Sequence, residues 1–101
     1  MALMEISVVP LGTGTPSVSG LVAAAVREAE NSGLDTELTP MGTVITGDVD
    51  ELLAVAGKMH RAVLSGDVKR VVTTIKIDDR TDKTLTAKGK LSSVREKLGR
   101  Q

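Results

Sequence analysis

The stretch LDTELTPMGTVIT, residues 34–46, decides the fold. Its first half alternates apolar and polar side chains with a period of two, which is typical of a β-strand with one buried face. Pro40 cannot donate a backbone hydrogen bond, so regular pairing breaks there and a second strand is predicted from Met41 to Thr46. The two strands are so close in the chain that a tight connection around residues 40–42 must join them. An antiparallel hairpin is the simplest outcome.

A strand pattern and a helix pattern flank this hairpin on each side. Alternation with a period of two marks the outer strands, and apolar stripes at helical spacing mark the helices. Thr15 or Ser17 can cap the first helix, while Asp48 and Glu51 have the spacing of a capping box at the second. We expect strands over residues 3–10 and 68–78, helices over residues 17–31 and 49–64, and a last helix over residues 91–98 that follows a polar segment.

This order of elements predicts an α+β fold, the ferredoxin-like βαββαβ sandwich with an additional short C-terminal helix. At 101 residues, we expect one domain spanning residues 1–101. Both main helices carry a single apolar stripe, so they should cover one face of the four-stranded sheet. By alternation, that face should carry Met4, Ile6, Val8, Leu38, Val71, Ile75 and Ile77.

The opposite, helix-free face mixes β-branched side chains with hydroxyls and a few charges. A half-polar face of this kind suits a contact between the sheets of two subunits that leaves a polar pocket. The alternative is a solvent-exposed sheet that is rich in Thr because Thr favours strands. We expect this face to carry Glu5, Ser7, Val9, Glu37, Thr39, Thr74 and Lys76, joined by Met41, Thr43 and Ile45 with the phase across Pro40 left open.

Composition excludes several classes of function. The 13 basic and 13 acidic residues balance, and no aromatic side chain is present, so we expect no nucleic-acid partner. The lack of cysteine excludes thiolate chemistry and Cys-ligated zinc. No apolar run is long enough to span a membrane and no signal-peptide pattern occurs, so a cytoplasmic location is expected. Asn and Gln occur once each, at Asn31 and Gln101, which hints at a thermophilic source.

Residues 12–17, GTGTPS, form a glycine-rich turn between a strand and a helix. Such a turn can present backbone N–H groups to an anion, but it lacks the Gly-Lys-Ser/Thr of a Walker A loop. The alternative is an ordinary connection that leads into a helix. An enzyme acting on phosphates at this turn is therefore the third-ranked hypothesis.

Other polar residues give no catalytic set. His60 is the only histidine and lies at the edge of the second helix's apolar stripe, so we interpret it as a boundary residue rather than a metal ligand. Asp78, Asp79 and Asp82 with Arg80 and Lys83 form either a divalent-cation site or, as we favour, a solvated turn with ion pairs. No nucleophile, base and oxyanion hole are visible together. We expect a protein that is not an enzyme and needs no cofactor or metal.

Three segments together resemble the thiamine-binding protein family, which is grouped with the YkoF-like superfamily and was formerly a domain of unknown function. They are VPLGTGTPSVS at residues 9–19, ELTPMGT at 37–43 and VKRVVTTIKIDDR at 68–80. The similarity spans nearly the whole chain in the right order. It implies a ferredoxin-like fold with paired sheets, usually in a dimer of dimers. It also implies binding of thiamine or its hydroxymethylpyrimidine part, with no known reaction.

The site implied by this resemblance falls on the half-polar face. An aminopyrimidine needs a hydrogen-bonding edge with a donor and an acceptor, which hydroxyls and a carboxylate can meet, while Met41 offers a polarizable thioether. The absent aromatic rings are a departure from common pockets for flat cations. The expected ligand-binding residues are Ser7, Thr13, Glu37, Thr39, Met41, Thr43, Thr74 and Lys76.

The expected function is therefore non-catalytic binding of thiamine or its hydroxymethylpyrimidine moiety. The ligand would lie at the paired-sheet interface of a homo-oligomer. The alternative is a structural or regulatory interaction module that uses the same face for oligomer contacts and holds no ligand.

Overall fold

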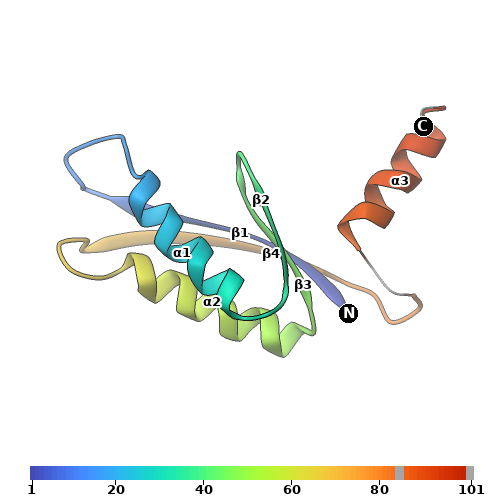
Figure 1. Ribbon diagram of the computed structural model, residues 1–101, viewed down its shortest axis with the longest axis horizontal. Helices are drawn as coiled ribbons and strands as arrows, with labels where there is room; N and C mark the ends of the chain where they lie inside the picture. Colours follow the sequence, from blue (N-terminus) through green and yellow to red (C-terminus); the bar gives the residue numbers. More distant parts are fainter. Residues whose placement is uncertain (84–85, 100–101) are drawn as a thin grey trace.

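The computed structural model describes residues 1–83 and 86–99. Strands β2, β3, β1 and β4 form one antiparallel sheet in that order, and α1 and α2 cover one of its faces (Figure 1). The predicted α+β, ferredoxin-like fold with an additional C-terminal helix is confirmed. The elements are β1 (Ala2–Leu11), α1 (Ser19–Asn31), β2 (Asp35–Thr39), β3 (Gly42–Gly47), α2 (Val49–Val63), β4 (Arg70–Asp79) and α3 (Ala87–Lys97).

Two helix starts differ from the prediction. The first helix begins at Ser19 rather than Ser17, and no side chain caps it. Thr15 instead accepts a hydrogen bond from the Ser17 N–H at 3.2 Å, which holds the preceding loop. The last helix begins four residues before Leu91, because Thr86 caps it by accepting a hydrogen bond from the Gly89 N–H at 2.9 Å.

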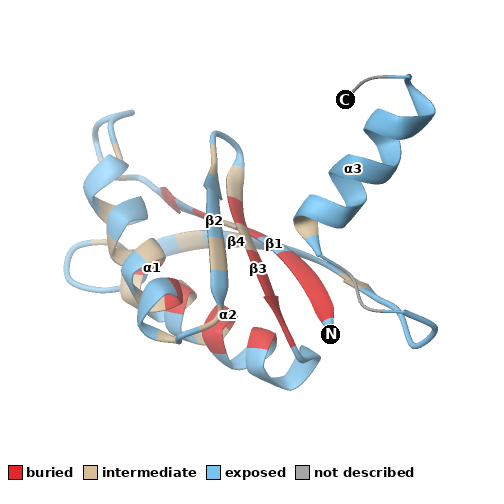
Figure 2. Cartoon of the chain, turned by 45° about the vertical axis from the view of Figure 1, so that its right-hand side comes forward, coloured by how far each residue is buried: buried red, intermediate tan, exposed pale blue. Residues whose placement is uncertain are grey.

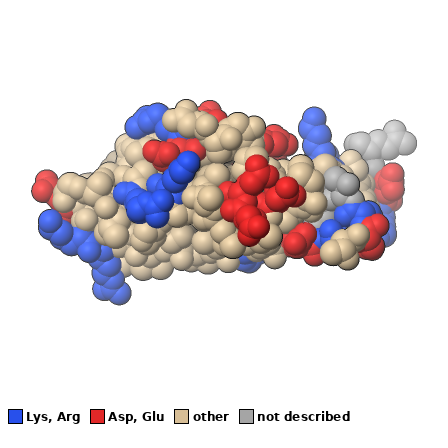
Figure 3. Space-filling model, turned by 90° about the horizontal axis from the view of Figure 1, so that it is seen from below, with Lys and Arg blue, Asp and Glu red and all other residues tan. Residues whose placement is uncertain are grey.

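The start of α2 follows the predicted capping box. The Asp48 N–H donates to the Glu51 carboxylate at 3.3 Å. With Asp50, these residues place three carboxylates at the positive end of the helix dipole. Figure 3, seen from the side on which α2 lies in Figure 1, shows a compact group of acidic side chains near the middle of that face.

The core lies between the two central strands and the two helices. Ala25 and Ala29 of α1 are buried, and their small side chains let that helix approach the core closely. Figure 2 shows the buried residues concentrated in β1, β3 and the inner sides of the helices. The largest fully buried side chains are Met4, Ile6, Ile45, Leu52, Met59 and Val63.

The pairing register assigns each strand residue to a face. Ile6 pairs with Thr43, and Met4 pairs with Ile45, so Thr43 and Ile45 lie on the helix-covered face. The prediction that they join the open face is wrong. Pro40 and Met41 form the turn, which makes Gly42 the partner of Thr39 and shifts the phase by one residue.

The outer strands are only partly covered on the helix side. The predicted face is correct for Leu38, Ile75 and Ile77, which pair in register with helix-facing residues. Their side chains nevertheless stay 64%, 39% and 37% exposed, because the two helices cover mainly the middle of the sheet. The monomer therefore leaves apolar surface at both sheet edges.

Two neighbouring leucines in α2 provide a test of this packing. Leu52 is fully buried, whereas Leu53 is 51% exposed. We expect Leu52→Ala to lower the free energy of unfolding by about 2–5 kcal/mol, because it leaves a cavity in the core. Leu53→Ala should change it by less than about 0.5 kcal/mol. Urea unfolding followed by far-UV circular dichroism measures both, and equal effects would contradict the assigned helix face.

Candidate functional site

A gap in strand pairing creates the first candidate cavity. β1 pairs with β4 from Ala2 to Leu11, but it pairs with β3 only from Ala2 to Ile6. Residues 7–11 of β1 therefore have one edge without a neighbouring strand. The β2–β3 turn lies beside this edge, and a cavity of ≈210 Å³ opens between the two. We call this cavity the notch.

The notch combines apolar walls with a few hydroxyls. Val22, Ala25 and Val26 of α1 line it together with Met59 of α2. The polar side chains around it are those of Ser7, Thr39 and Thr43, and the turn contributes Pro40 and Met41. Four of the expected ligand-binding residues, Ser7, Thr39, Met41 and Thr43, are thus brought together here.

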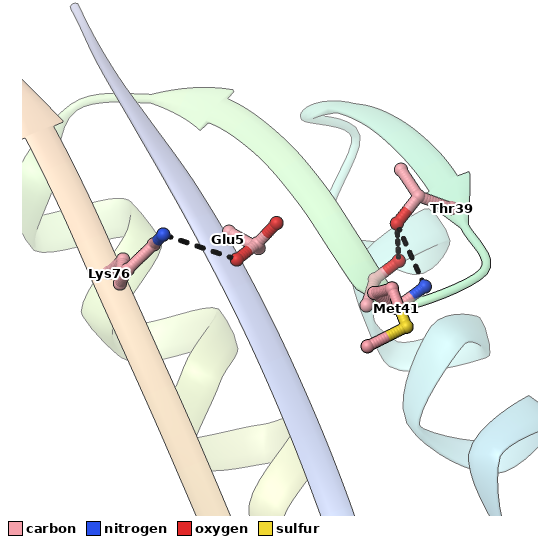
Figure 4. Close-up of polar contacts among 5 residues, drawn as sticks. Glu5, Thr39, Met41 and Lys76 are labelled. Carbon is pink, nitrogen blue, oxygen red and sulfur yellow. Dashed lines mark hydrogen bonds and ion pairs between the residues drawn. The ribbon is translucent and has the colours of Figure 1, made fainter.

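Thr39 holds the turn at the mouth of the notch. Its hydroxyl donates to the Gly42 carbonyl oxygen at 2.9 Å and accepts from the Met41 N–H at 3.3 Å (Figure 4). These bonds leave the Met41 side chain 83% exposed. A large, soft and apolar side chain so open to solvent is available to a ligand or a partner.

A second, wider cavity lies over the open face of the sheet, beside the start of α3. We call it the trough; its volume is ≈670 Å³. Leu3 and Val44 give it an apolar floor, and Glu5, Glu37 and Lys76 give it charge. Thr39 lines both the trough and the notch, so the two cavities adjoin at this residue.

The charges of the trough are largely solvated. Lys76 and Glu5 pair across β4 and β1 with Nζ and Oε1 3.8 Å apart (Figure 4), and their side chains are 79% and 47% exposed. Such a pair contributes little to stability. Both groups are therefore free to rearrange around a charged ligand at small cost.

Two expected site residues lie elsewhere. Thr13 is in the β1–α1 loop, where its hydroxyl donates to the Thr15 carbonyl at 2.7 Å. Gly12 and Gly14 in this loop have φ values of +72° and +76°, which glycine adopts readily, so its sequence is explained by backbone shape. Thr74 is exposed on the open face opposite Ser7 and lines neither the notch nor the trough.

Some residues of these cavities were missed in the sequence. Val22 and Val26 belong to a helix stripe that reads as ordinary core, so nothing in their spacing separates cavity wall from packing. Val44 faces the trough because it pairs with Glu5. The sequence did not show this, because it left open which residues after Pro40 point to which face of the sheet.

The remaining candidates from the sequence have structural partners. His60 Nδ1 lies 2.6 Å from the Thr73 hydroxyl and joins α2 to β4 at the border of the core, as a boundary residue does. Arg80 pairs with Asp82, and this hydrogen bond lowers the pKa of the Asp82 carboxyl. Asp78 pairs with Lys90 at 2.6 Å. Within residues 1–83 and 86–99, no three His, Asp or Glu side chains are grouped to hold a metal ion.

None of the described helices has the length and apolar content needed to cross a membrane.

A comparison with known protein families finds a match over most of the chain. The family model described as "Thiamine-binding protein" matches residues 4–95. The chain belongs to this family. The resemblance seen in the three sequence segments is confirmed.

Relatives in this family match over most of their length. UPF0045 protein YqgV of Bacillus subtilis is 39% identical over 102 residues, which cover 97% of this chain and 98% of that protein. UPF0045 protein MJ1052 of Methanocaldococcus jannaschii is 44% identical over 92 residues, or 91% and 90% of the two chains. Both identities, over most of each chain, support the family assignment.

Solved structures share the fold. The crystal structure of MJ1052 superposes with a TM-score of 0.86 at 42% identity, covering 94% of this chain and 96% of that one. A Thermotoga maritima protein whose name refers to thiamine biosynthesis and salvage gives a TM-score of 0.79 at 22% identity, covering 93% and 98%. At that identity the second likeness shows the fold alone.

Gly42 provides a test of the notch's geometry. A Cβ at this position would lie 2.9 Å from the Ile6 carbonyl oxygen, whereas a Cβ at Gly20 would meet nothing within 4 Å. We expect Gly42→Ala to push β3 from β1 and to lower the free energy of unfolding by about 1–3 kcal/mol. Gly20→Ala should be neutral or slightly stabilising. Urea unfolding midpoints compare the two, and a neutral Gly42→Ala would contradict the close approach of these strands.

Proposed function

We propose that this protein is a non-catalytic binding protein for thiamine or its hydroxymethylpyrimidine moiety. The pyrimidine ring occupies the notch, and the rest of the ligand extends toward the trough. Membership of the thiamine-binding protein family supports the ligand class. The observation that carries the site is the notch itself, where a free strand edge and hydroxyls meet in an apolar cavity.

The size of the notch favours a single ring. Pockets for drug-sized ligands have volumes of about 300–1,000 Å³. At ≈210 Å³ the notch is smaller, so it accommodates one heterocycle rather than all of thiamine. The trough, at ≈670 Å³, has room for the remaining part.

The chemistry of the notch suits an aminopyrimidine. This ring presents an amino donor beside a ring-nitrogen acceptor. An unpaired strand edge presents backbone N–H and C=O groups in alternation, which is the complementary pattern. Hydroxyls such as those of Ser7 and Thr43 can serve as donor or acceptor. In a chain without aromatic residues, Met41 and Pro40 supply the contact with the ring face.

The trough suits the charged half of thiamine. The thiazolium ring carries a permanent positive charge, and Glu5 and Glu37 place carboxylates next to Thr39, where the two cavities adjoin. Such a contact favours the cation over a neutral analogue. Lys76 at the far side of Glu5 is placed to meet a phosphate on a phosphorylated ligand.

The proposal includes a homo-oligomer, in which the open sheet faces of two copies meet and further pairing gives a dimer of dimers. Val9 and Val72 are paired neighbours on the open face and are 46% and 45% exposed, so together they offer apolar surface to a second copy. The cytoplasmic location and thermophilic source expected from composition stay predictions.

A second candidate function is a structural or regulatory module without a ligand. The exposed apolar side chains of α3 favour it, since Leu91, Val94 and Leu98 are 50%, 57% and 61% exposed. The two functions differ in one measurable respect, which is heat of binding with thiamine-type ligands.

Calorimetry with hydroxymethylpyrimidine tests the site. Thr43→Val keeps the side-chain shape but removes a hydroxyl from the notch, and we expect it to weaken binding roughly tenfold, the effect of one hydrogen bond. Thr74→Val, on the open face outside both cavities, is the matched control and should bind like the wild type. Absence of heat with thiamine, its phosphates and hydroxymethylpyrimidine would overturn the proposal.

Comparing the binding of a charged ligand, thiamine, with that of a neutral one, hydroxymethylpyrimidine, tests the role of the trough. Glu37→Gln should weaken thiamine binding about two- to fivefold, as expected for a solvent-exposed charge, and leave hydroxymethylpyrimidine binding unchanged because that ligand is neutral. Glu30→Gln, an exposed change on α1, is the control. An equal loss for both ligands would show that Glu37 does not face the thiazolium ring.

A further inference from the structure

A third cavity lies between the end of β4 and one side of α3. We call it the basic cleft; its volume is ≈410 Å³, within the range of about 300–1,000 Å³ that is typical of small-molecule sites. Arg80 and Lys83 line it from the segment that follows the strand. Lys90, Ser93 and Lys97 line it from the helix, where their spacing of three and four residues puts them on one face. Two separate elements therefore supply its walls.

Positive charge is concentrated in the basic cleft. The whole chain has a formal net charge of zero, but the cleft is lined by four cationic side chains and one carboxylate. Lys90 Nζ pairs with the carboxylate of Asp78 at 2.6 Å, and Arg80 Nε donates to Asp82 at 2.7 Å. These two pairs account for two of the four cations.

Lys83 and Lys97 are the other two cations. Among the residues that the structure describes, neither of them forms an ion pair. Two positive charges from opposite walls of the cleft are thus left for a ligand. A phosphate group carries a charge of about −1.5 to −2 at neutral pH, so a single phosphate group matches them.

Hydroxyl groups add hydrogen-bond donors to this charge. Thr86 Oγ1 accepts a hydrogen bond from the Gly89 N–H at 2.9 Å, which leaves its own O–H to donate to a phosphate oxygen. Ser93 supplies a second hydroxyl. Val94 is the one apolar side chain in the described lining, so the cleft is suited to charge rather than to a ring, unlike the notch.

We propose that the basic cleft binds the phosphate group of a small phosphorylated molecule. Lys83 and Lys97 hold the phosphate from the two walls, and Thr86 donates a hydrogen bond to it. A cleft of ≈410 Å³ leaves room for the organic part of such a ligand. This site goes beyond the proposed function, because it shares no residue with the notch and needs no thiamine-type ligand.

The bound phosphate would also fix α3 in place. None of the residues of α3 is buried, and a helix of 11 residues is marginal in water without tertiary contacts. A phosphate held by both walls joins the helix to the end of β4. Amide hydrogen exchange in residues 87–97 should therefore slow when phosphate is added.

Calorimetry with two probes, inorganic phosphate and glycerol 3-phosphate, tests the site at constant ionic strength. Lys83→Gln combined with Lys97→Gln removes both available charges, and we expect it to weaken binding of either probe roughly tenfold or more. The same double variant should lose the slowing of amide exchange in α3. Glycerol 3-phosphate should bind the wild type at least as tightly as inorganic phosphate does.

The matched control is Lys58→Gln combined with Lys88→Gln, which removes the same total charge. Lys88 lies on α3 but outside the cleft, and Lys58 is an exposed residue of α2. This variant should change binding less than about twofold, because salt screens charges at a distance. Thermal melts by circular dichroism check that both double variants fold.

Three outcomes would overturn the inference. The first is a wild type that binds neither probe, and the second is an equal loss of binding in the two double variants, which would indicate general attraction by the surface charge. The third is a clear preference for inorganic phosphate over the ester, which would exclude a phosphorylated molecule as the ligand. None of these results bears on hydroxymethylpyrimidine binding in the notch, so the two claims fail separately.

Discussion

The structure depends on one constraint, the point at which β3 stops pairing with β1. Pro40 and Met41 are consumed by the hairpin turn, so β3 begins at Gly42 and its contact with β1 ends at the Ile6–Thr43 pair. This register buries Ile45 over the helices and leaves the second half of β1 with a free edge. The core and the notch are therefore consequences of the same turn.

The architecture was predictable from the sequence because strand and helix periods are distinct. Alternation in β1 and β4 and the apolar stripes of α1 and α2 gave the order and the covered face. The face of Thr43 and Ile45 was not predictable, because alternation restarts after a turn whose length the sequence leaves open. The start of α3 was missed for a related reason, since Thr86 caps a helix whose first turn is polar.

The candidate site was likewise predicted only in part from the sequence. Ser7, Thr39, Glu37 and Lys76 were placed by alternation and by the family resemblance, and they line the two adjoining cavities. Thr13 came from the glycine-rich loop, whose composition follows from the backbone shape of Gly12 and Gly14. Residues that line the notch, such as Val22, cannot be told from core residues in the sequence, because both belong to the apolar stripe of a helix. A cavity is a gap in packing, and a linear pattern does not reveal where packing stops.

The central claim is that a heterocycle binds between the free edge of β1 and the β2–β3 turn. Amide NMR spectra recorded during a titration with hydroxymethylpyrimidine test this most directly, because every residue except proline reports on its own backbone N–H. The account predicts that the largest shifts fall on residues 7–9 and 39–43, with little change in the loop at residues 12–17. Shifts centred on that loop or on α3, or a spectrum that does not change, would contradict it.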